Sequence, residues 1–139
     1  MDDALLGIYE KIADGAWRLE FPKGLKDIKD YSLNEVREWP EFLSDKLRAQ
    51  LGCDSSHENR AKTWMDAIYP KDLTAAHAAL VAHLETKGLS EYDLVVRYKA
   101  YNGKHIRVRC SGVAIFVNGS PVSMSGIHKL LEVSDTPID

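Results

Sequence analysis

The chain has 139 residues, of which 45% are hydrophobic and 28% charged, the balance of an ordinary globular protein of one domain. Its net charge is −3, so it lacks the concentrated basic character that nucleic acids and anionic membranes attract. No apolar run approaches the roughly 20 residues that span a bilayer, and the acidic N-terminus does not resemble a signal peptide. We therefore expect a cytoplasmic protein with neither nucleic acid nor membrane as its partner.

Neither cysteine chemistry nor a catalytic motif is indicated. Cys53 and Cys110 stand in no metal-ligand spacing, which favours two free thiols in a reducing compartment and leaves a disulfide open. The sequence shows no glycine-rich phosphate loop, no nucleophile elbow and no HExxH motif. We predict that the protein is not an enzyme.

The first half of the chain predicts short helices and two strands. In chain order these are an amphipathic helix at 2–13, a strand at 16–21, a loop at 22–30, a second strand at 33–39, a helix at 41–51, a loop at 53–60 and a short helix at 61–68. Pro40 ends the second strand, and Gly52 provides a C-cap for the helix after it. Trp64 and Ile68, four residues apart, share one face of the last helix.

The clearest helix follows Pro70, with Asp72 as its N-cap, and ends at Gly88. Its buried stripe consists of apolar residues at helical spacing: Leu73, Ala76, Leu80 and Leu84. His77 lies between two of these residues in register, so it is tilted toward the core side of the helix.

Residues 90–131 predict an antiparallel meander of three strands. Asn102-Gly103 and Asn118-Gly119 separate the apolar runs, and Asn-Gly pairs favour hairpin turns. A two-residue loop at the first turn would align Leu94, Val96 and Tyr98 with two arginines. A three-residue loop with Gly103 in a left-handed bulge aligns them instead with Ile106, Val108 and Cys110. We predict the second register, because the first would place Arg107 and Arg109 in the core.

Two strands, several helices and three long strands predict an α+β domain. The five strands can form one antiparallel sheet with the helices on one side.

These elements carry residues that resemble the PAS family. The stretch Thr63–Leu73 (TWMDAIYPKDL) resembles a PAS signature, with Tyr69 where histidine is commoner. The matching residues of this stretch and of the following strands are Trp64, Ile68, Pro70, Asp72, Tyr92, Arg97, Gly103, Gly112, Gly119, Met124 and Gly126. Upstream, Phe42, Leu47, Leu51 and Gly52 match, with Pro40 where serine is usual. The resemblance covers about residues 14–131 and is nearest to the subgroup found in bacterial chemoreceptors, sensor histidine kinases and cyclic-di-GMP enzymes.

The resemblance implies a PAS domain at 14–133, with an N-terminal flanking helix at 1–13 and the start of a linker at 134–139. It implies a five-stranded sheet in the order 2-1-5-4-3. The implied function is sensory: a small ligand or cofactor binds between helices and sheet, and the signal passes to an effector domain that is not part of this chain. The apolar stripe Leu5, Ile8, Tyr9 and Ile12 predicts that the flanking helix packs on the outer sheet face or on a partner's copy, giving a homodimer.

The expected ligand contacts lie on the long helix, the helix before it and the meander strands. They are Trp64, Ile68, His77, Leu80, Val81, Leu94, Val96 and Val108. His77 is similar in its offset from Pro70 to the proximal histidine of haem-binding PAS oxygen sensors, so it would be a metal ligand if haem is bound, with Tyr92 on the distal side. The alternative is a rim histidine with no ligand role.

Two further questions concern the remaining histidines and a flavin cofactor. His83 matches a structural position of the family, and His57, His105 and His128 show no metal-site spacing. The run Asn59–Ala67 lacks the cysteine of the blue-light subgroup, so no flavin photoadduct is expected.

Three interpretations stay open from the sequence: a ligand-binding sensor (with a haem-based gas sensor as a special case), a ligand-free PAS module for dimerisation and relay, and a small enzyme of unknown type. Arg97 also has two interpretations. It forms either an ion pair at the sheet edge, which we favour, or a relay pair to the flanking helix.

Overall fold

The computed structural model describes residue 8, residue 11 and residues 13–139. The helix expected at 2–13 therefore lies almost entirely outside the described residues. Within the described part of the chain, no helix is both long enough and apolar enough to cross a bilayer.

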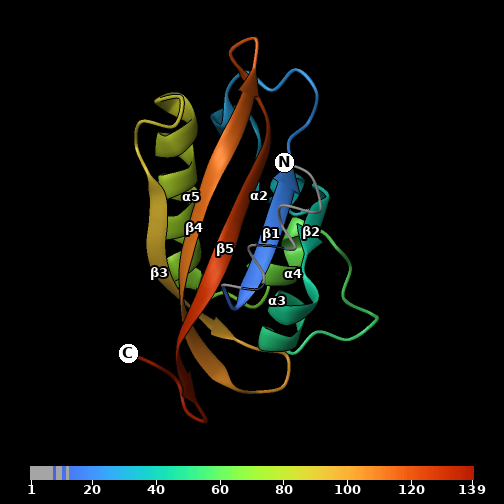
Figure 1. Ribbon diagram of the computed structural model, residues 1–139, viewed down its shortest axis with the longest axis vertical. Coiled ribbons are helices and arrows are strands. Elements are labelled where there is room, and N and C mark those ends of the chain that lie inside the picture. The colour runs from blue at the N-terminus through green and yellow to red at the C-terminus, as the bar shows by residue number, and fades with distance from the viewer. Residues whose placement is uncertain (1–7, 9–10, 12) are drawn as a thin grey trace.

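Five antiparallel strands form one sheet in the order β2-β1-β5-β4-β3, which confirms the predicted fold class (Figure 1). The strands are β1 (Gly15–Glu20), β2 (Glu41–Leu43), β3 (Tyr92–Lys99), β4 (His105–Val117) and β5 (Ser120–Ser134). The three long strands contain the β-branched and aromatic runs that pack well on a pleated surface. They form the centre and one edge of the sheet, and the short strand β2 forms the other edge.

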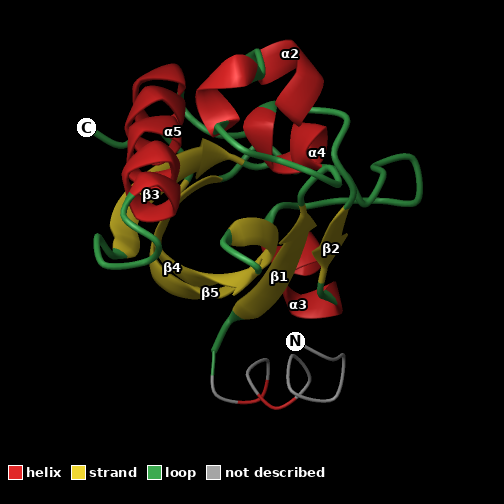
Figure 2. Cartoon of the chain, turned by 90° about the horizontal axis from the view of Figure 1, so that it is seen from above, coloured by secondary structure: helices red, strands yellow, loops and turns green. Residues whose placement is uncertain are grey.

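Most helices cover one face of this curved sheet. The helical elements are η1 (Ile28–Asp30), α2 (Leu33–Val36), α3 (Asp45–Gln50), α4 (Ala61–Met65) and α5 (Pro70–Glu85). Figure 2 shows α2, α4 and α5 on the concave side of the strands. The hydrophobic core lies between these helices and the sheet.

The second strand predicted at 33–39 is wrong, because this segment begins with helix α2. Ser32 is its N-cap and forms a capping box: the Ser32 hydroxyl accepts from the Glu35 amide, and the Glu35 carboxylate accepts from the Ser32 amide. This pairing satisfies two amide donors that the first helical turn leaves free. The capping residues, rather than the apolar pattern, decide the structure here.

The helix predicted at 41–51 is wrong over its first three residues, which form β2. Glu41 and Leu43 point inward and are buried, whereas Phe42 is exposed. The helix α3 begins only after Ser44, whose hydroxyl accepts from the Leu47 amide as N-cap and from the Ala16 amide of β1. The C-cap of α3 is Leu51 rather than the expected Gly52, which follows it with a positive φ of 70° and so ends the helix.

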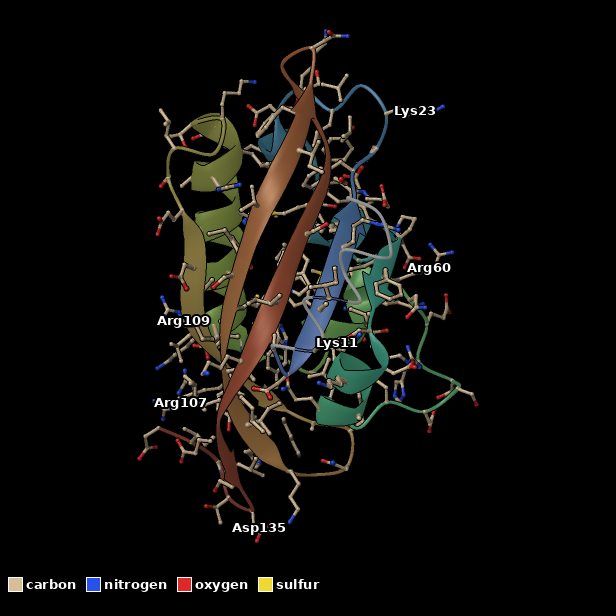
Figure 3. All side chains as sticks on the ribbon, viewed as in Figure 1. Lys11, Lys23, Arg60, Arg107, Arg109 and Asp135 are labelled. Atoms are coloured by element: carbon tan, nitrogen blue, oxygen red, sulfur yellow. The ribbon has the colours of Figure 1, made fainter. Side chains whose placement is uncertain are left out.

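The predicted register of the first long hairpin is confirmed. Val96 pairs with Val108, and Gly103 has a φ of 87°, as the bulged three-residue turn requires. Val108 is fully buried under the helices. Arg107 and Arg109 lie on the other side of β4 and project away from the helical layer (Figure 3).

Two glycines hold Trp17 against the middle of the sheet. Gly112 and Gly126 are paired across β4 and β5, and Gly126 also pairs with Trp17 itself. A Cβ at Gly126 would lie 2.3 Å from Trp17 Cζ2, so only glycine leaves room for the indole. The ring of Trp17 thereby reaches over β5 toward β3, where it meets Tyr92 edge to face at 6.1 Å between centroids.

A cavity between helices and sheet as the candidate site

A partly open cavity lies between the helical layer and the concave face of the sheet. Its volume is about 50 Å³, measured as the space open to the centre of a water molecule. One water needs roughly 10–15 Å³ on this measure, so the cavity has room for a few waters or a small ligand. Most lining side chains are apolar, and the polar or aromatic ones are Trp17, Glu41, Trp64, His77, Tyr92, Tyr98, Cys110 and His128.

Glu41 is the acidic residue of this lining. It stands on β2 opposite Leu19 of β1, and only 4% of its surface is exposed. Trp64 Nε1 of α4 donates a hydrogen bond to Glu41 Oε1 at 2.9 Å. Burial outweighs this hydrogen bond and raises the pKa of the Glu41 carboxyl to about 8, because an apolar surrounding disfavours the charged form. The carboxyl is therefore mainly protonated at neutral pH.

One nitrogen atom of the lining residues, His77 Nε2 on α5, is buried without a hydrogen-bond partner in the described structure. The Trp17 side chain of β1 instead interacts with the Cys110 thiol. Buried polar atoms in folded proteins are nearly always hydrogen-bonded, and an exception needs an explanation. A ligand or water in the adjoining cavity would provide one.

His128 of β5 is the second imidazole of the lining. Its Nδ1 lies 3.0 Å from Gln50 Oε1, and burial lowers its pKa to about 4, so the ring is neutral at pH 7. With Oε1 as the acceptor, Nδ1 must hold the proton and Nε2 keeps a free lone pair. His128 pairs with Gly15 of β1, four residues from Leu19, the partner of Glu41. The two polar groups thus stand at different levels of the sheet.

The phenols and the thiol of the lining are uncharged at neutral pH. Burial raises the pKa of Tyr92 and of Tyr98 well above the usual range. Burial likewise raises the pKa of the Cys110 thiol strongly, whereas a reactive cysteine needs a lowered pKa. Cys53 is also a free thiol and is not among the lining residues. Neither environment favours a thiolate.

Five of the eight expected contact residues line the cavity. They are Trp64, Ile68, His77, Leu80 and Val96. Val81, Leu94 and Val108 are not among the described lining residues. On α5 the neighbouring residue Leu80 takes the cavity-facing position in place of Val81.

The sequence does not predict Glu41 and His128 as lining residues. Glu41 was assigned to a helix, where an acidic residue at the start is an ordinary solvent-exposed position. The signal that could have placed it is the stretch Pro40–Leu43 next to Ser44: a proline, three residues and a strong N-cap leave room for a short edge strand. In that strand Glu41 and Leu43 share a face.

The other histidines serve structural contacts. His83 Nδ1 lies 2.7 Å from the Ser90 carbonyl oxygen, and its Nε2 accepts from the Ala114 amide at 3.0 Å, so it ties the end of α5 to β4. His105 Nδ1 lies 2.6 Å from the Tyr69 hydroxyl. No group of three potential metal ligands occurs among the described residues.

An ion pair joins the start of α5 to β3 and to the C-terminal segment. Asp72 is not the N-cap as predicted, because Tyr69 occupies that position and Pro70 is the first helical residue. The Asp72 carboxylate instead accepts from Arg97 Nε and Nη2, both at 2.8 Å, and from the Arg97 amide at 2.7 Å. These bonds hold the pKa of Asp72 below its usual range. Arg97 Nη1 also donates to the Ile138 carbonyl at 3.1 Å.

The fit of a haem to these residues is partial. His77 offers a buried imidazole nitrogen without a partner, which suits an axial ligand. A porphyrin, however, is many times larger than a space for a few waters, and α2 and α5 would have to move apart to admit it. The His77 imidazole suits haem as an axial ligand, whereas the volume of the cavity is too small for the porphyrin.

The fold and this cavity define an α+β domain with a small apolar cavity between helices and sheet. The family described as "PAS fold" matches residues 40–128, which is more than half of the chain. The chain belongs to the PAS family.

Solved structures show the same fold. A sensory box histidine kinase/response regulator from Burkholderia thailandensis E264 is 22% identical, with a TM-score of 0.64 over 90% of this chain and 82% of that one. A light-oxygen-voltage domain studied with a flavin analogue is 14% identical, with a TM-score of 0.62 over 95% and 87%. A variant of RsLOV is 16% identical, with a TM-score of 0.58 over 94% and 70%. A comparison with curated protein sequences finds no significant match.

Proposed function

We propose that this PAS domain is the sensory part of a signalling protein and binds a small molecule in the cavity between helices and sheet. The observation that carries the proposal is the pairing of an apolar cavity with a buried polar atom that has no hydrogen-bond partner among the described residues, His77 Nε2. Ligand sites are mostly apolar concavities with a few polar groups that orient the ligand. No catalytic role follows from this arrangement.

The size of the cavity limits the ligand. A molecule much larger than a few waters would require the helices to move, so we do not extend the proposal to haem or flavin. Leu33, Trp64, Leu73 and His77 line the cavity and keep contact with solvent, and they come from α2, α4 and α5. We infer that a ligand enters between these helices.

We propose the Asp72–Arg97 pair as the link from the cavity to an effector domain. Leu73 and Ala76 of the first turns of α5 line the cavity, and Asp72 stands beside them. Arg97 connects Asp72 with the Ile138 carbonyl, and the Ile138 amide donates to the Tyr69 hydroxyl at 3.1 Å. A shift of α5 on ligand binding would therefore act on the C-terminal segment, which packs against the domain through Ile138.

The test is a thermal-unfolding screen with small molecules on wild type and on Ala76→Phe. Ala76 lines the cavity and is buried, so a phenyl group there fills the space. Ala78→Phe on the exposed side of the same helix is the matched control. We expect ligands that raise the Tm of wild type and of Ala78→Phe and leave Ala76→Phe unchanged. A ligand that stabilises all three proteins equally would contradict a site in this cavity.

A second candidate function, a ligand-free module for dimerisation and relay, is favoured by the outer face of the sheet. Val113 of β4 is 64% exposed, and Val95 of β3, which pairs with Arg109, is exposed as well. Exposed apolar residues on one sheet face can belong to a protein interface. A dimer contact on the outer face is also compatible with the sensor function, because it leaves the cavity free.

A further inference from the structure

The cavity contains a carboxyl group and no fixed cation. Among the described residues that line it, none is a lysine or arginine, and Glu41 is the one acidic side chain. The hydrogen bond from Trp64 Nε1 does not explain why residue 41 is an acid, because the carbonyl of a glutamine would accept this bond equally well. A buried carboxyl without a counter-charge is costly, and such groups concentrate at functional sites.

Aromatic rings form much of the wall around this carboxyl. Trp17, Trp64, Tyr92 and Tyr98 contribute from β1, α4 and β3. The faces of tryptophan and tyrosine rings attract cations, most strongly where water is excluded. Aromatic faces combined with one acid and no basic residue give a site of negative potential.

We infer that the ligand of this cavity is a small organic cation, a simple or methylated ammonium, held between the aromatic rings with Glu41 as its counter-ion. The inference rests on the proposed function, since it names the chemical class of the ligand for the same site. The volume of the cavity restricts the cation to a few carbon atoms around the nitrogen.

Binding of such a cation releases a proton. Burial keeps Glu41 mainly protonated in the empty cavity, and a cation beside it favours the carboxylate. The proton leaves Glu41 for solvent as the cation enters, so charge is conserved within the site. The exchange makes the affinity rise with pH up to the pKa of the carboxyl.

The other titratable groups of the lining do not compete for this role. Burial raises the already high pKa values of Tyr92 and Tyr98 on β3 and of Cys110 on β4, and it lowers the pKa of His128 on β5, so all four are uncharged at pH 7. The elements β1, α2, α3 and α4 contribute no titratable lining side chain. His77 on α5 is the remaining group, and a variant of it serves as the control.

The test is isothermal titration calorimetry with choline and its neutral isostere 3,3-dimethylbutan-1-ol, in which a carbon replaces the charged nitrogen. Choline has no titrating group in this range. We expect wild type to bind choline with an affinity that rises on the order of 100-fold from pH 6 to pH 9. The isostere should bind more weakly and show no such rise.

Glu41→Gln separates the carboxylate from the shape of the cavity. This variant retains the acceptor for Trp64 Nε1 and should lose the affinity for choline while its affinity for the isostere is unchanged. His77→Gln should keep the pH dependence. Equal choline binding by wild type and Glu41→Gln, or equal binding of choline and the isostere by wild type, would overturn the inference.

The outcome also separates this inference from the proposed function. If choline fails to bind and the thermal screen finds neutral or anionic ligands that Ala76→Phe abolishes, the cation inference is wrong and the sensor function stands. If no compound of either experiment binds to the wild-type cavity, both are wrong.

Discussion

Glu41 shows how one buried residue sets the pH dependence of stability. Its pKa is about 8 in the folded protein against an ordinary value of 4.5, so the folded state holds the proton more tightly than the unfolded chain. The protein therefore loses stability as the pH rises from 4.5 to 8. His128 acts in the opposite direction, because its pKa falls from 6.5 to about 4 and its contribution is lost as the pH falls through this window.

We predict that Glu41→Gln becomes more stable relative to wild type as the pH rises from 5 to 8. The difference should approach about 3 kcal/mol at pH 7, since each unit of pKa corresponds to about 1.4 kcal/mol. Urea unfolding at several pH values measures it. Parallel stability curves for the two proteins would show that Glu41 titrates normally and is not buried as described.

Val108 and Arg107 test the register of the central hairpin at the level of single residues. Val108→Asp should unfold the domain or lower its stability by several kcal/mol, because it leaves a charge unpaired in the core. Arg107→Asp loses an exposed pair with Glu132 and should cost about 1 kcal/mol or less. The Tm values of both variants measure this difference. A lower Tm for Arg107→Asp than for Val108→Asp would mean that β4 presents its opposite face to the core.

At the scale of elements, the meander could be predicted and the second strand could not. Two Asn-Gly turns and the need to keep Arg107 and Arg109 out of the core leave one acceptable register for β3 and β4. The region before α4 has no such constraint, because α2, β2 and α3 are too short for periodicity to appear. Caps at Ser32 and Ser44 decide these elements.

The same difference between long and short elements explains which residues of the candidate site can be predicted from the sequence. Trp64, Ile68 and His77 belong to α4, α5 and the connection between them, where helical spacing indicates the inward face. Glu41 belongs to a three-residue strand whose position depends on pairing with β1, a contact between segments 22 residues apart at Leu19 and Glu41. Burial of a charged residue also runs against the expectation that local sequence provides.

The N-terminal segment is the element that bears on assembly. Residues 2–13 are predicted to form an amphipathic helix that packs on the outer sheet face or on a partner's copy, where Val95 and Val113 are exposed. Deletion of residues 1–13 should shift the sedimentation profile from dimer toward monomer. The full chain is the control, and a monomeric profile for both proteins would remove the predicted homodimer.

At the scale of the whole molecule, the domain places its polar lining groups on opposite layers. The sheet provides Glu41 and His128, the helices provide His77 and Trp64, and the free volume lies between them. A molecule in this space contacts both layers at once, so it can change how α5 sits on β3. The Asp72–Arg97 pair lies where these two elements meet.

The three tryptophans allow the central claim, that a ligand occupies this cavity, to be tested in one measurement. Trp17 and Trp64 line the cavity, whereas Trp39 packs outside it against Phe21 and Tyr31. Each indole N–H gives its own peak in a ¹H–¹⁵N correlation spectrum, assigned by Trp→Phe variants. On titration with a ligand from the thermal screen, we predict shifts of the Trp17 and Trp64 indole peaks and a constant Trp39 peak. Binding that shifts Trp39 alone, or none of the three, would contradict the account.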